Sequence, residues 1–172
     1  MPFRLRVVAC ILVVSILAAC SHAPDASTTP NHTSDTAFAS MQQRGKMAMG
    51  VDQTTSTHQF DAMPDGGRIE LLRDVNDSLG IAQIRAHLRL IQHAFQAGDF
   101  STPQFVHMKR MPGTAVMAQK RELITYSYHE LPRGGEVIMQ TSDASALAAI
   151  HEFMGAQRTE HHATGAGPGM HD

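Results

Sequence analysis

The sequence has no tryptophan and only two cysteines, Cys10 and Cys20, among its 172 residues. Because no cysteine follows residue 20, no disulfide can cross-link the rest of the chain, and its fold must depend on hydrophobic burial. The chain also has no Gly-x-Ser-x-Gly segment, no glycine-rich phosphate loop and no His-Glu-x-x-His segment. These absences leave an enzyme of any familiar type without support in the sequence.

The charged residues nearly balance, with 14 basic against 16 acidic side chains and a formal net charge of −2. Such a composition gives no reason to expect a nucleic-acid partner. Histidine and methionine are the abundant residues, with eleven of each. Since imidazole and thioether groups are ligands for transition metals, a functional prediction begins with them.

The first twenty residues have the order of an export signal. Arg4 and Arg6 precede an apolar run over residues 7–17, which is shorter than the roughly 20 residues that a membrane-spanning helix needs. The run leads into Leu-Ala-Ala-Cys at residues 17–20, which resembles the lipobox of bacterial lipoproteins. The resemblance implies a signal peptide over residues 1–19 and a lipid on the thiol of Cys20. An ordinary secretory signal that happens to end in cysteine is the alternative.

The mature chain is predicted to begin at the lipidated cysteine and to be held on a membrane by that lipid. In lipoproteins of Gram-negative bacteria the next residue influences sorting, and Ser21 implies the outer membrane, with the protein in the cell envelope facing the periplasm. Residues 20–43 are polar and are predicted to form a flexible tether. Residues 44–160 are predicted to form one domain, and residues 161–172, rich in histidine and glycine, a disordered tail.

Two parts of this domain, about residues 57–98 and 122–160, show the same order of elements. Each has a Pro-x-Gly-Gly turn, at residues 64–67 and 132–135, between two strand-like segments, and each continues into a helix. The sequence therefore predicts an α+β fold in which two ββα repeats form a four-stranded antiparallel sheet with two helices on one face. Chance similarity of two hairpins is the alternative to a true repeat.

Capping residues and breakers set the predicted helix boundaries. The first helix is expected to follow the cap residues 76–78 and to stop at Gly98, and the second to follow residues 142–143. The first helix has an apolar stripe that consists of Ile81, Ile84, Leu88, Ile91 and Phe95. The connector over residues 98–121 is predicted to contain one short helix, at residues 114–120.

Four histidines lie on segments that the predicted sheet and helices could bring together, and they form the candidate metal site: His58, His87, His107 and His151. Imidazole suits copper and zinc, either of which is the predicted metal. No pair has the His-x-x-x-His spacing that places two ligands on one helix face. A hydrogen-bonded core histidine is therefore the alternative at each position. A second, weaker candidate site on the tail consists of His161, His162 and His171.

The domain also resembles a group of small bacterial proteins of uncharacterised function. The resemblance spans about residues 44–160 and rests on Met-Gly-Val-Asp-Gln at 49–53, Ser-Thr-His-Gln-Phe at 56–60, Pro-Asp-Gly-Gly at 64–67, Ile-Arg-Ala-His-Leu at 84–88 and Ala-Ile-His-Glu-Phe at 149–153. It implies that His58, His87 and His151 are positions of interest. Members of the group tend to have a second histidine where this chain has Gln59. Some carry the label aspartate carbamoyltransferase, but this chain is much shorter than that enzyme and lacks its Ser-Thr-Arg-Thr phosphate loop.

The leading functional prediction is a lipid-anchored, periplasm-facing protein whose small domain binds a ligand, namely a transition metal held by histidines. The alternative is a structural or protein-interaction lipoprotein that binds a protein partner through the uncovered face of the sheet and holds no metal. A third alternative, an enzyme of unknown type, rests only on the label of the resembling proteins.

Overall fold

The computed structural model describes residues 32–165 and residue 167. The predicted signal peptide, the lipidation site Cys20 and the tail residue His171 lie outside the described residues. Within the described part of the chain, no helix is long and apolar enough to cross a membrane.

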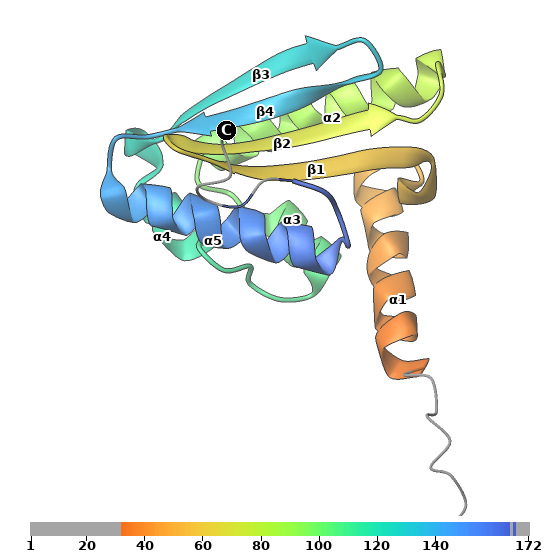
Figure 1. Ribbon diagram of the computed structural model, residues 1–172, viewed down its shortest axis with the longest axis horizontal. Helices are drawn as coiled ribbons and strands as arrows, with labels where there is room; N and C mark the ends of the chain where they lie inside the picture. The colour runs from red at the N-terminus through yellow and green to blue at the C-terminus, as the bar shows by residue number, and fades with distance from the viewer. Residues whose placement is uncertain (1–31, 166, 168–172) are drawn as a thin grey trace, which may run out of the picture. The chain divides into compact units, whose positions relative to one another are not determined.

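A four-stranded antiparallel sheet forms the centre of the described chain (Figure 1). Its strands lie side by side in the order β1 (Ser56–Met63), β2 (Gly66–Arg73), β4 (Gly134–Gln140) and β3 (Thr125–Leu131). Strands β1 and β2 form one hairpin and β3 and β4 the other, and antiparallel pairing of β2 with β4 joins the two. The predicted pair of hairpins in one antiparallel sheet is therefore confirmed.

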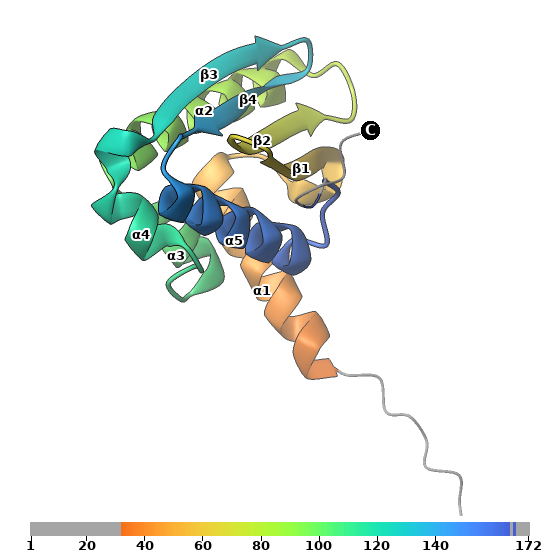
Figure 2. The same ribbon diagram turned by 60° about the vertical axis from the view of Figure 1, so that its left-hand side comes forward.

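Helices α2 (Ser78–Gln96) and α5 (Ala144–Glu160) each follow one hairpin and share one hydrophobic core with the sheet (Figure 2). The predicted apolar stripe of α2 is buried along its whole length. At its end the ring of Phe95 lies 5.8 Å from that of Phe153 on α5, edge to face. The ββα arrangement and the α+β class predicted from the sequence are confirmed. The connector contains α3 (Ser101–His107), α4 (Thr114–Gln119) and the 3-10 turn η2 (Arg121–Leu123), of which the sequence predicts only α4.

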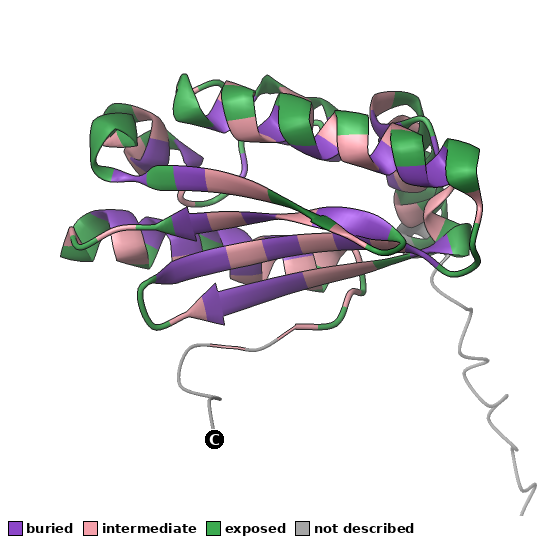
Figure 3. Cartoon of the chain, turned by 90° about the horizontal axis from the view of Figure 1, so that it is seen from above, coloured by how far each residue is buried: buried purple, intermediate pink, exposed green. Residues whose placement is uncertain are grey.

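The two faces of the sheet differ in burial, as the alternating colours along the strands show (Figure 3). On β2, Ile69 and Leu71 face the helices and are 6% and 4% exposed. Arg68 and Glu70, which alternate with them along the strand, lie on the opposite face and are only partly buried. The apolar core therefore lies on the helix side of the sheet, as expected for an antiparallel sheet with one polar face.

A further helix, α1 (His32–Met49), precedes the 3-10 turn η1 (Gln53–Thr55) and β1. The sequence predicts a flexible tether up to residue 43, and this prediction is wrong for residues 32–43. Met41 and Met49 are each 6% exposed, and Nε of Arg44 donates to the carbonyl oxygen of Val106 at 2.7 Å. The polar composition gives no sign of this helix, which is held by contacts with α3, far away in the sequence.

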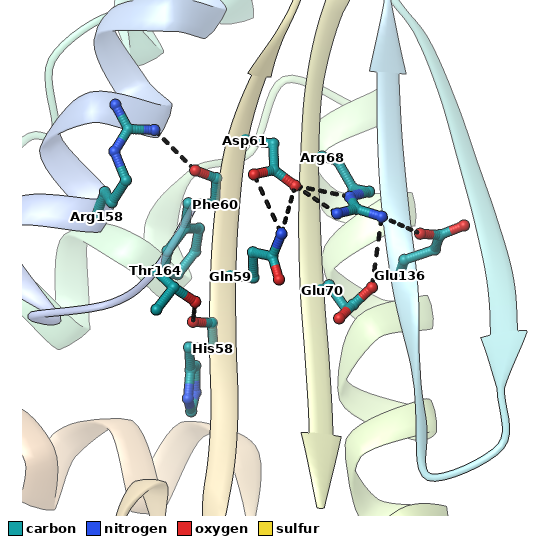
Figure 4. Close-up of polar contacts among 9 residues, drawn as sticks. All are labelled: His58, Gln59, Phe60, Asp61, Arg68, Glu70, Glu136, Arg158 and Thr164. Carbon is teal, nitrogen blue, oxygen red and sulfur yellow. Dashed lines mark hydrogen bonds and ion pairs between the residues drawn. The ribbon is translucent and has the colours of Figure 1, made fainter. Parts of the chain in front are cut away.

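The residues after α5 lie along the outer edge of β1 (Figure 4). The amide of Phe60 donates to the carbonyl oxygen of Thr164 at 3.0 Å, and the guanidinium of Arg158 donates to the carbonyl oxygen of Phe60 at 2.8 Å. The prediction of a disordered tail is therefore wrong for residues 161–165. An edge strand presents backbone groups without a neighbouring strand, and this segment satisfies some of them.

Replacement of Asp143 by alanine is expected to lower the melting temperature by a few degrees, because Asp143 caps α5. Its carboxylate accepts from the amides of Ser145 at 3.0 Å and Ala146 at 2.9 Å. The ammonium of Lys120, the amide of Ala146 and the hydroxyl of Ser145 hold the pKa of Asp143 well below its usual range. Asp77, at the same position before α2, has no side-chain capping bond and pairs with Arg73 at 3.2 Å instead. Thermal unfolding of Asp143→Ala and Asp143→Asn checks the cap, because asparagine keeps an oxygen that can accept from these amides, and equal losses in the two variants would contradict a capping role.

Candidate functional site

A cavity of about 80 Å³ lies between the sheet and the helices beside it. Four histidines line it, and each comes from a different part of the fold: His58 from β1, His87 from α2, His107 from α3 and His161 from the turn after α5. Most of the remaining wall is apolar, and no Asp, Glu, Lys or Arg of the described residues belongs to it. The imidazoles are therefore the titratable groups of this cavity.

His107 ends α3 with its side chain fully buried. Its Nδ1 lies 2.8 Å from Oε2 of Glu160, and its Nε2 lies 2.9 Å from Oε1 of Gln157. Burial acts to raise the pKa of Glu160, but hydrogen bonds from Lys109 and His107 outweigh it and lower that pKa. Glu160 is thus an ionised acceptor at neutral pH, and it fixes the proton of His107 on Nδ1.

His161 lies against His107 from the opposite direction. Its Nδ1 is 3.1 Å from Oε1 of Gln53, and its Nε2 is 3.2 Å from Nε2 of His107. Its ring also stacks on that of His58, with ring centres 5.8 Å apart and planes within 6°. Burial lowers the pKa of His161 to about 3, and the neighbouring imidazoles add to this effect. His161 is therefore neutral at physiological pH.

The hydrogen bonds of these two rings leave their Nε2 atoms facing each other. Nδ1 of each ring faces an oxygen acceptor and so carries a proton, which means that the neutral form of each imidazole has its lone pair on Nε2. Oε1 of Gln157 also faces Nε2 of His107. With both rings in that form, Nε2 of His107 faces two further lone-pair atoms, Nε2 of His161 and Oε1 of Gln157. Buried polar atoms arranged in this way need a positively charged or hydrogen-donating partner among them.

His58 and His87 stand on the other side of the cavity. Burial lowers the pKa of His58 to about 4, against a hydrogen bond with the backbone of Ser56 that acts to raise it. Burial also lowers the pKa of His87, against a similar bond with the backbone of Ala48. Both rings are therefore neutral near pH 7. Each uses one nitrogen for a backbone carbonyl, and the other nitrogen is an acceptor.

The structure brings together only some of the histidines in each of the two predicted sites. His58, His87 and His107 of the first set line one cavity, whereas Nε2 of His151 lies 2.8 Å from the carbonyl oxygen of Met63 and is not part of the cavity wall. His161 of the tail set belongs to the cavity. The ring of His162 instead stacks on Phe38 of α1, with centres 4.3 Å apart.

Sequence reasoning missed three residues that set the geometry of the histidine pair, namely Gln53, Gln157 and Glu160. One signal was available, because residues 157, 160 and 161 have i, i+3 and i+4 spacing and so share one face at the end of a helix. Nothing in the sequence pairs this face with α3. Within the described residues, no group of three or more His, Cys, Asp or Glu side chains is arranged to hold a metal ion.

A second polar cluster lies on the uncovered face of the sheet (Figure 4). The guanidinium of Arg68 donates to Oδ2 of Asp61 at 2.6 Å and lies 3.5 Å from Glu70 and 3.7 Å from Glu136. Glu70 and Glu136 face each other across β2 and β4, so Arg68 offsets the repulsion between them. This cluster fits a cross-strand ladder that stabilises the sheet.

The chain was compared with protein-family models, curated proteins and solved structures, and none of these comparisons finds a match.

Proposed function

We propose that this protein binds a transition-metal ion between His107 and His161, with the amide oxygen of Gln157 as a third ligand. The observation that carries the proposal is the approach of the Nε2 atoms of His107 and His161 to 3.2 Å in the wall of the cavity. A proton shared between the rings is the competing cation. The low pKa of His161 disfavours only the form in which that proton belongs to His161, and a proton on Nε2 of His107 remains the competitor that a metal must displace.

The separation of the two nitrogens suits a common metal ion. With metal–nitrogen bonds of roughly 2.0–2.1 Å, tetrahedral or square arrangements place neighbouring nitrogens about 2.9–3.4 Å apart. The distance of 3.2 Å between the Nε2 atoms of His107 and His161 lies within this interval. The rings therefore need little rearrangement to bind a metal, which reduces the cost of binding.

The groups behind the two rings support the same function. A histidine that binds a metal usually donates its other ring N–H to a carboxylate or carbonyl, which orients the ring and makes it a better ligand. Glu160 stands in this position behind His107, and the side-chain amide of Gln53 stands behind His161. Both rings are therefore oriented by oxygen atoms on the side away from the proposed metal.

The ligand chemistry selects copper or zinc. Neutral imidazoles bind both, and for a given set of ligands Cu²⁺ usually binds more tightly than Zn²⁺. The thioether-bearing Met49 also lines the cavity. The lipobox-like leader supports the location of this function: a lipid-anchored protein of the cell envelope, on the outer membrane and facing the periplasm, that holds the metal outside the cytoplasm.

Metal titration of the purified protein tests the proposal. We expect binding of Cu²⁺ or Zn²⁺, and replacement of either His107 or His161 by alanine should weaken it beyond the roughly 10–100-fold that loss of a supporting partner causes. Glu160→Gln should fall within that smaller range because it removes only the supporting carboxylate. Isothermal titration calorimetry measures the affinities, and elemental analysis measures the bound metal.

His93→Ala is the matched control, because His93 is exposed on α2 and does not line the cavity. This variant should bind metal as the parent protein does. Circular dichroism of each variant separates loss of binding from loss of folding. No bound metal and no thermal shift with copper, zinc or nickel would remove the proposal, and so would unchanged affinity in a folded His161→Ala variant.

A further inference from the structure

Strand β3 forms one outer edge of the sheet, and β1 forms the other (Figure 1). The edge of β1 is partly occupied, because the backbone of Phe60 bonds to Thr164 and to Arg158. On the outer side of β3, no strand of the described chain pairs with it. Since an open strand edge is a template for pairing with another chain, β3 is the edge of this sheet at which such pairing is expected.

The register of the sheet shows which backbone groups of β3 point outward. The amide of Thr141 donates to the carbonyl oxygen of Asp65, so the odd-numbered residues of β4 bond to β2. The even-numbered residues of β4 therefore bond to β3, where their partners have odd numbers. The outward-pointing amide and carbonyl groups of β3 are consequently those of Tyr126, Tyr128 and Glu130.

Two of these three residues have no backbone partner within the described chain. The side-chain amide of Gln92 donates to the carbonyl oxygen of Tyr126 at 3.1 Å, whereas no described group bonds to the outward groups of Tyr128 and Glu130. Lysine, proline and bulges usually protect a strand edge, and β3 has none of them. Each copy of the chain therefore presents two donors and two acceptors in a row.

These groups match those of a second copy in one antiparallel register. With Tyr128 opposite Glu130 of the second copy, the two-fold axis passes beside His129, and each such pair exchanges two backbone hydrogen bonds. The register uses the free outward groups of Tyr128 and Glu130 in both copies. It also keeps the bond from Gln92 to Tyr126, so pairing disrupts no hydrogen bond that the single chain already has.

The charged side chains beside β3 fit the same register. Glu130 forms ion pairs with Arg89 and, at 3.1 Å, with Arg85, and the guanidinium of Arg89 lies 4.8 Å from the ring centre of Tyr128. Directly opposite residues of an antiparallel pair project to the same face. Glu130 of each copy would therefore lie beside the partner's Tyr128 and Arg89. The two Glu130 carboxylates would be diagonal to each other, and the arginines of both copies offset their repulsion.

We infer that this protein forms a symmetric dimer in which the β3 edges of two copies pair antiparallel about His129. The two sheets then form one continuous sheet. A second copy is the partner because the edge of β3 is complementary to itself, both in its backbone groups and in its charges. The inference does not depend on the proposed metal site.

Sedimentation equilibrium of the purified protein measures the association, and amide hydrogen exchange followed by nuclear magnetic resonance locates the interface. We expect a reversible monomer–dimer equilibrium in which the amides of Tyr128 and Glu130 lose protection on dilution. The amides of Ser127 and His129 bond to β4 within one copy, so their protection should depend less on concentration.

Charge reversal tests the register. Glu130→Arg is expected to raise the dissociation constant of the dimer at least about tenfold, because each dimer has two copies of the altered contact. Arg89→Glu combined with Glu130→Arg places opposite charges across the interface again and should recover most of the association. Lys46→Glu is the matched control, since it reverses one charge of the exposed Lys46–Asp52 ion pair on the helix before β1. It should leave the dissociation constant unchanged, and thermal unfolding shows whether each variant is folded.

A protein that stays monomeric up to about millimolar concentration would overturn the inference. That result would leave the β3 edge to a strand from a different protein. A dimer in which the amides of Tyr128 and Glu130 exchange as fast as in the monomer would also overturn it, because another surface would then form the interface. Unchanged association of a folded Glu130→Arg variant would contradict the pairing about His129.

Discussion

Replacement of Phe153 by alanine is expected to lower the free energy of unfolding by about 3–5 kcal/mol. The side chain of Phe153 is 0% exposed. Its ring contacts those of Phe95 and Phe100 edge to face, with centres 5.8 Å and 6.1 Å apart. The substitution would leave a cavity where α5 meets α2 and the start of α3, and a packed core of this kind closes such a cavity only in part.

Urea denaturation measures this loss, and Phe105→Ala is the control. Phe105 is 45% exposed, so its replacement removes less buried area and should cost clearly less. Similar losses in the two variants would contradict the position given to Phe153. An unchanged dependence on urea concentration would show that the unfolding reaction itself is the same in both proteins.

The central fold could be predicted because its signals are local. A Pro-x-Gly-Gly segment between two strand-like segments indicates a hairpin within about ten residues, although the structure has a two-residue turn at residues 64–65 and 132–133 and places the glycine pairs at the start of β2 and β4. The stripe from Ile81 to Phe95 indicates which face of α2 is buried. The repeat of this pattern then limits how the two hairpins can join. Among the four strands of the sheet, the pairing of β2 with β4 is the one that joins residues far apart in the sequence.

The segments at the two ends of the domain could not be predicted in the same way. The polar sequence of helix α1 predicts a tether. The helix is instead held by contacts such as that of Arg44 with Val106. The glycine and histidine content after α5 predicts a disordered tail. The start of this segment is instead held on the edge of β1, where the carbonyl oxygen of Thr164 accepts from the amide of Phe60. The composition of a segment indicates only how many apolar side chains that segment can bury. These contacts depend on partners more than 60 residues away, so composition cannot predict them.

The candidate site shows the same division. The sequence indicates which histidines lie on apolar segments, and His58, His87 and His107 do meet in one cavity. It does not indicate which ring bonds to the backbone outside the cavity, as His151 does with the carbonyl oxygen of Met63. His161 joins the cavity only because α5 ends beside α3, a property of the packing.

Lowering the pH from 6.5 towards 4 is expected to destabilise the metal-free protein by several kcal/mol. Burial lowers the pKa of His58 to about 4 and that of His161 to about 3, from an ordinary value of 6.5. Below pH 6.5 the unfolded chain therefore takes up protons that the folded chain does not bind. Each of these histidines contributes at most about 1.4 kcal/mol per pH unit to the loss, and the contribution ends above pH 6.5.

His58→Phe isolates this effect, because it keeps an aromatic ring beside His161 and removes one titrating group. Between pH 6 and pH 4.5 the free energy of unfolding of the variant should fall less steeply with decreasing pH than that of the parent. The difference in slope should be about 1.4 kcal/mol per pH unit, the value for one proton. His93→Ala should leave the slope unchanged because His93 is exposed. Denaturation at a series of pH values measures all three proteins, and parallel curves for parent and His58→Phe would show that His58 is protonated in the folded chain as readily as in the unfolded one. Bound metal should deepen the acid loss, because protons compete with it for His107 and His161.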